Sequence, residues 1–147
     1  MHRANPLLAA ALALAGCGSA PKCATVDAQG VVGTLGPKEQ FRSMLKVVTE
    51  RTQTAAMVSR RDGASAPEAL AGAINAVVER RHREWEQNLV IAWGTLSSDE
   101  LAQVCTALGQ RDQATYMKFA ERVGAEVQKR NEPLLKSAGA EVLSVIF

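Results

Sequence analysis

Histidine and aromatic residues are scarce in this chain of 147 residues. It contains two histidines, His2 and His82, and only two tryptophans, one tyrosine and three phenylalanines. A histidine-based metal site needs several ligands, and an activated serine or cysteine nucleophile needs a neighbouring base. We therefore predict no catalytic residue, no metal site and no cofactor, and we expect that the protein is not an enzyme.

The chain also lacks a long apolar run and a large excess of positive or negative charge. Its longest apolar run covers residues 7–15, whereas a helix that crosses a bilayer needs about 20 residues. The formal net charge is only +2, with 17 basic and 15 acidic side chains. Because a nucleic-acid-binding domain shows a clustered basic excess, we do not expect a nucleic-acid partner.

The first residues have the order of features found in an export signal. A positive charge at Arg3 precedes the apolar run, which ends in Leu14-Ala15-Gly16-Cys17. A short apolar run flanked in this way is typical of a cleaved signal peptide and not of a membrane anchor. The sequence Leu14-Ala15-Gly16-Cys17 resembles the lipobox of bacterial lipoproteins.

This resemblance implies that residues 1–16 are removed and that Cys17 receives a diacylglyceryl group and an acyl chain such as palmitate. Two or three acyl chains hold a protein stably on a membrane. Gly18 follows the cysteine where an aspartate would favour the inner membrane. By the same resemblance, we expect a lipid-anchored protein of the cell envelope, on the periplasmic face of the outer membrane.

Two further cysteines, Cys23 and Cys105, remain after Cys17 is used for lipid. In an oxidising compartment they can form a disulfide that persists. The alternative is that Cys105, which falls in the apolar pattern of a helix, is a buried free thiol. The sequence leaves both alternatives open.

The 131 residues that follow the signal are enough for one domain. Residues 17–36 are rich in glycine, with no sustained apolar period, and indicate a flexible tether, although a short strand at Val31 and Val32 remains an alternative. Residues 37–147 show helical periodicity and no alternating strand pattern. We expect an all-α fold, a small antiparallel bundle of four to five helices after the tether.

Start and stop signals divide residues 37–147 into helices. The first is expected from Pro37 to about residue 61, and the second begins at a capping box of Ser65 and Glu68 and ends near Trp93. Ser97 and Glu100 form another capping box, whose helix is expected to end at Gly109. A fourth helix begins near Asp112, and Pro133 is expected to separate it from a fifth helix capped by Asn131.

The second helix contains the residues that we single out as a candidate surface. Arg81 falls within its apolar stripe, where a charge must pair with a carboxylate or reach water past its stem. The end of this helix is apolar all round, so it is either buried or exposed as a contact patch. The candidate surface for a partner or ligand comprises Arg81, Trp85, Leu89 and Trp93.

These patterns lead to one functional interpretation and two alternatives. The favoured interpretation is a non-catalytic, lipid-anchored helical module that binds another, unidentified component of the cell envelope. One alternative is a carrier of a small apolar ligand, such as a lipid, in a cavity lined by Ile74, Trp85, Leu89 and Trp93. The other alternative is an enzyme, which the scarcity of histidine disfavours.

Overall fold

The protein is all-α, as predicted from its sequence. We describe a computed structural model in which residues 22–52, 56–57, 60–61 and 63–146 are placed. Within these residues the structure contains five α-helices with defined bounds, further helical residues at 56–57 and 60–61, one short 3-10 helix and no strand. None of these helices is both long and apolar enough to cross a membrane. The signal peptide and Cys17 lie outside the described residues.

The described chain divides into two compact units. Unit 1 contains residues 22–36 and 89–128, and unit 2 contains residues 37–88 and 129–146. The long helices α5 (Ala66–Trp93) and α7 (Gln113–Ile146) contribute one stretch to each unit. The expected small helical fold is thus present, and each of its two units has its own buried side chains.

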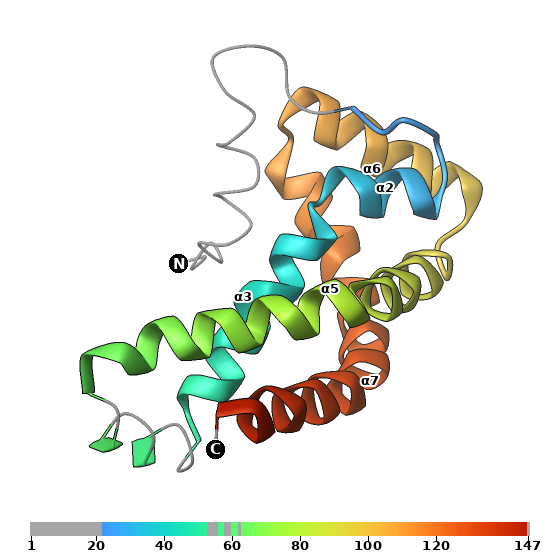
Figure 1. Cartoon of the computed structure of the whole chain (residues 1–147). Coiled ribbons are helices and arrows are strands. Elements are labelled where there is room, and N and C mark those ends of the chain that lie inside the picture. The colour runs from blue at the N-terminus through green and yellow to red at the C-terminus, as the bar shows by residue number, and fades with distance from the viewer. Residues whose placement is uncertain (1–21, 53–55, 58–59, 62, 147) are drawn as a thin grey trace. The chain divides into compact units, whose positions relative to one another are not determined.

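Unit 1 begins with a helix that the sequence pattern did not predict. Helix α2 (Ala28–Thr34) is capped by Asp27, whose carboxylate accepts a hydrogen bond from the Gly30 amide at 2.8 Å. Val31 and Val32 are buried, and α2 packs against α6 (Ser98–Gln110) (Figure 1). The expectation of a flexible tether is wrong for residues 28–34, because packing supplies the stability that a seven-residue helix lacks by itself.

The start of α6 has the predicted cap. The Ser97 hydroxyl accepts a hydrogen bond from the Glu100 amide at 3.2 Å, and the Glu100 carboxylate accepts one from the Ser97 amide at 2.9 Å. Leu96 and Leu101, on either side of this box, are both buried. The helix ends later than expected, since Arg111 and not Gly109 has the left-handed conformation that terminates it, with φ 57°.

Unit 2 contains α3 (Pro37–Glu50), the first part of α5 and the last part of α7. Helix α3 begins at Pro37 as predicted but ends at Glu50, and residues 56–57 and 60–61 are again helical, so the expected helix to about residue 61 is interrupted after Glu50. The hydroxyls of Thr49 and Thr52 donate to backbone carbonyls of Leu45 and Thr49 around this end. Helix α5 has the predicted extent, and a 3-10 turn, Gly63–Ser65, leads into it.

Helix α7 continues through Pro133, so the predicted break is wrong. Proline has no amide hydrogen and leaves the carbonyl four residues earlier without its helical partner. Here that carbonyl belongs to Lys129. The side chain of Asn88 on α5 donates to the next carbonyl, that of Arg130, at 3.2 Å and to Asn131 Oδ1 at 2.9 Å. Asn131 therefore links two helices as a buried residue and does not cap a fifth helix.

Candidate functional site

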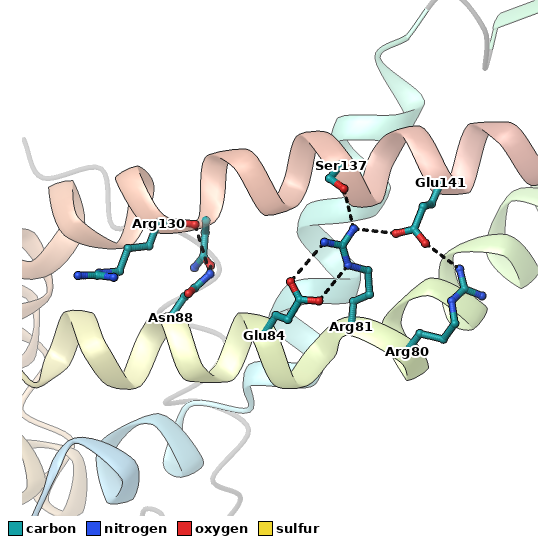
Figure 2. A network of polar contacts seen from close by, with 8 residues as sticks. Arg80, Arg81, Glu84, Asn88, Arg130, Ser137 and Glu141 are labelled. Atoms are coloured by element: carbon teal, nitrogen blue, oxygen red, sulfur yellow. Dashed lines mark hydrogen bonds and ion pairs between the residues drawn. The ribbon is translucent and has the colours of Figure 1, made fainter.

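Arg81 lies at the centre of a polar network between α5 and the last part of α7, within unit 2 (Figure 2). Its guanidinium donates through Nη1 to Glu141 Oε2 at 2.7 Å and to Ser137 Oγ at 2.8 Å. Nε and Nη2 each donate to one carboxylate oxygen of Glu84 at 3.3 Å. The side chain is 20% exposed, so the stem is largely covered while the charged head is paired with carboxylates.

Glu141 connects two arginines of α5. Its second oxygen accepts from Arg80 at 3.2 Å (Figure 2). The hydrogen bond from Arg81 is the main reason that the pKa of Glu141 lies below its ordinary value, and Arg80 adds to it. In turn, Glu84 first and Glu141 second raise the pKa of Arg81. The arrangement is a charged network in which the Arg81 head already has three partners on the protein.

The Asn88–Asn131 pair lies two turns further along α5. Asn131 is 2% exposed, and its Nδ2 atom is buried without a hydrogen-bond acceptor among the described residues. The indole Nε1 of Trp85 is buried in the same way. A buried donor that stays without an acceptor costs about 1–3 kcal/mol.

The apolar members of the candidate surface are buried. Trp85, Leu89 and Trp93 are each 3% exposed. Within unit 2 the Trp85 ring stacks on Phe41 with ring centres 5.2 Å apart, and within unit 1 the Trp93 ring stacks on Tyr116 at 6.0 Å. The hypothesis of an exposed contact patch formed by these three residues is therefore wrong, because each lies within the core of its own unit.

The exposed apolar residues lie elsewhere. In unit 2 they are Val47, Met57 and Val145, and in unit 1 they are Val26 and Ile91. Sequence reasoning did not single out Val26, Val47 or Met57, because nothing in the local sequence marks them as exposed. Ile91 lies in the stretch at the end of α5 that was expected to be either buried or exposed. Sequence reasoning also missed Ser137 and Glu141 as partners of Arg81. They are 56 and 60 residues away from it in the chain, and no local pattern connects them with it.

His82, the histidine of α5, has a partner on its own helix. Its Nδ1 atom lies 3.0 Å from Glu86 Oε1. One turn earlier Glu79 pairs with Lys38 of α3 at 2.5 Å, which lowers the pKa of Glu79. Among the described residues no group of three or more histidine, cysteine or acidic side chains is arranged to hold a metal ion.

Cys23 and Cys105 form a disulfide within unit 1, with Cα atoms 5.6 Å apart. The segment between Cys23 and α2 also packs closely on that helix. A Cβ atom at Gly30 would lie 1.7 Å from the Thr25 carbonyl oxygen, so only glycine permits this approach. Residues 23–36 are therefore an integral part of unit 1.

Comparison with known proteins gives no relative for this chain: neither the models of protein families, nor the curated proteins, nor the solved structures contain a match. The class of protein that the structure defines is all-α.

Proposed function

We propose that this protein is an exported lipoprotein whose helical part is a non-catalytic module that binds another component of the cell envelope. The observation that carries the first half is the sequence Leu14-Ala15-Gly16-Cys17 directly after a short apolar run. The order of charge, apolar run, small residues and cysteine is the one that export and lipidation require. Lipid on Cys17 would fix the protein to a membrane without a membrane-spanning helix.

The disulfide between Cys23 and Cys105 supports export. Disulfides persist in the periplasm and outside the cell and are rare in the cytosol, where thiols are kept reduced. Both cysteines belong to the compact part of unit 1, so the bond is a structural one. Gly18 after the lipobox favours the outer membrane over the inner membrane as the place of anchoring.

Two features of unit 2 support a binding role: its central polar side chains are paired within the protein, and some apolar side chains are exposed. Arg81, Glu141 and His82 all have partners within the protein. Arg81 and Glu141 connect α5 with α7, and His82 pairs with Glu86 within α5. Contact area for a partner is available at Val47, Met57 and Val145, whose side chains are 40%, 54% and 64% exposed. A partner that covers these side chains would remove apolar surface from water and so stabilise the complex.

The anchor and the binding role need separate tests. Cys17→Ala should abolish labelling with radioactive palmitate and release the protein from the membrane fraction. Labelling that persists in this variant would contradict the anchor.

For the binding role, a photoreactive amino acid at Val145 should give a defined adduct with one envelope protein in intact cells. The matched control is the same amino acid at Lys136, an exposed position of α7. A photoreactive residue in the captured protein should in turn capture this chain. Equal adducts from both positions, or none from Val145, would contradict a binding surface there.

A further inference from the structure

The disulfide fixes where the chain leaves unit 1. Cys23 is bonded to Cys105 on α6, and Cys23 follows Cys17 by only six residues. Without the disulfide, the first firmly held residue would be nearer to Asp27, the cap of α2. The disulfide therefore determines both the length of the connection to Cys17 and the part of unit 1 at which it is attached.

The connection is short compared with unit 1. Six residues span at most about 20 Å when fully extended. A compact unit of some 55 residues has a radius of gyration of about 10 Å and hence a diameter of about 26 Å. A unit held by a connection shorter than its own diameter cannot turn its attachment point away from the anchoring membrane.

The surface around the attachment point has suitable side chains for a bilayer interface. Val26 is 62% exposed, the highest exposure among the large apolar residues of unit 1. Lys22 is exposed, and its stem runs beside Gly109, where a Cβ atom would lie 3.8 Å from Lys22 Cγ. Gly109 lies one helical turn after Cys105 on α6, so it shares the face of the disulfide. Val26 directly follows Thr25, whose carbonyl oxygen lies 4.0 Å from Cys105 Sγ, so it also belongs to the surroundings of the disulfide. An exposed apolar side chain together with a lysine on a long stem matches the boundary between acyl chains and headgroups.

We propose that the surface formed by Lys22, Cys23, Val26, Cys105 and Gly109, here named the disulfide face, lies against the headgroups of the bilayer that holds the anchor. The proposal rests on the proposed function, because it takes Cys17 to carry the lipid. It departs from the expectation that residues 17–36 form a flexible tether, which would leave unit 1 free to turn. The disulfide face is a membrane contact, and the remaining surface of unit 1 is directed away from the bilayer.

Photocrosslinking to lipid tests the orientation on the full protein in its native membrane. A benzophenone amino acid replaces Val26 in one variant and Asp99 in a matched control. Asp99 is exposed on α6, ten residues before Gly109, and thus about 15 Å away along the helix. We expect several-fold more lipid adduct from position 26 than from position 99. Equal capture, or more capture from position 99, would overturn the proposal.

A second variant tests the role of the short connection without touching the fold. A flexible glycine-serine insert of about 20 residues between Gly18 and Ser19 lengthens the connection. Lipid capture from position 26 should fall to the level of position 99, and unchanged capture would overturn the argument from length. Palmitate labelling of every variant separates the two proposals: a labelled protein with no preference for position 26 contradicts only the orientation, whereas an unlabelled protein contradicts the anchor and the orientation together.

Discussion

Replacement of Arg81 by methionine tests whether the network between α5 and α7 stabilises unit 2. Methionine keeps an unbranched stem of similar length and removes the guanidinium. It therefore deletes the ion pairs to Glu84 and Glu141 and the hydrogen bond to Ser137, while much of the stem packing remains. The two carboxylates stay 58% and 39% exposed, so neither is left as a buried, unpaired charge.

The expected loss of stability in Arg81→Met is modest because Arg81, Glu84 and Glu141 are all partly exposed. Ion pairs of this kind contribute about 0.2–1 kcal/mol each, and a side-chain hydrogen bond about 0.5–1.5 kcal/mol. The desolvation of a partly exposed arginine offsets some of this stabilisation, and Glu141 retains Arg80 at 3.2 Å. We expect Arg81→Met to lower the free energy of unfolding by about 1 kcal/mol at neutral pH.

The pH dependence gives a second, independent signature. The folded-state pKa of Glu141 lies below its ordinary value of 4.5, so its contribution is present above that value and is lost as the pH falls through the folded pKa. Because Arg81 is the main cause of this shift, the difference in stability between wild type and Arg81→Met should become smaller as the pH falls below 4.5.

Urea unfolding followed by circular dichroism measures both quantities, on protein that begins at Gly18 and keeps the disulfide. Arg83→Met, at an exposed position of α5, is the control and should change stability by less than about 0.5 kcal/mol. A variant as stable as wild type at neutral pH, or a difference that does not depend on pH, would refute the reasoning.

Three further predictions concern unit 1. Ser97→Ala should lower the stability by about 1 kcal/mol in thermal unfolding because it removes half of the capping box, whereas Ser98→Ala should have little effect; equal effects would contradict the assigned cap. Gly30→Ala should lower the free energy of unfolding by about 1–3 kcal/mol, because its methyl group collides with the Thr25 carbonyl. In Gly33→Ala the added methyl group meets nothing within 4 Å, so this variant should raise the stability of α2 by about 0.5–1 kcal/mol. The opposite order would show that residues 23–27 do not pack on Gly30. Burial raises the pKa of Tyr116 to about 12, so ultraviolet titration of this single tyrosine should show no ionisation near pH 10. The free energy of unfolding should decrease as the pH rises above the ordinary pKa of 10.0. Ionisation at the ordinary pKa would contradict the burial of Tyr116 against Trp93.

Helices with strong local signals could be predicted from the sequence, and helices stabilised by distant contacts could not. The start of α6 was predictable because Ser97 and Glu100 satisfy each other's backbone donors within four residues. Helix α2 was not, since it depends on packing against α6 and on the disulfide to Cys105. The continuation of α7 through Pro133 likewise has no local sequence signal, since Asn131, expected as a cap, is instead bonded to Asn88 of α5.

The candidate site shows the same division. Arg81 was predictable as a charge within an apolar stripe that needs a carboxylate. Its partner Glu141 was not, because nothing in the local sequence distinguishes this glutamate from other exposed ones. The sequence did not decide whether Trp85 and Trp93 are buried or exposed. In the structure both are buried, stacked on Phe41 and Tyr116, which are distant in the sequence.

The central claim is that Cys17 becomes the lipid-bearing first residue of the mature protein. Mass spectrometry of the protein extracted from membranes of the cells that make it tests this directly. The account predicts a mature chain that begins at Cys17, with a diacylglyceryl group on its sulfur, an acyl chain on its amino group, and an intact bond between Cys23 and Cys105. A chain that still begins at Met1, or a Cys17 with an unmodified thiol, would contradict it.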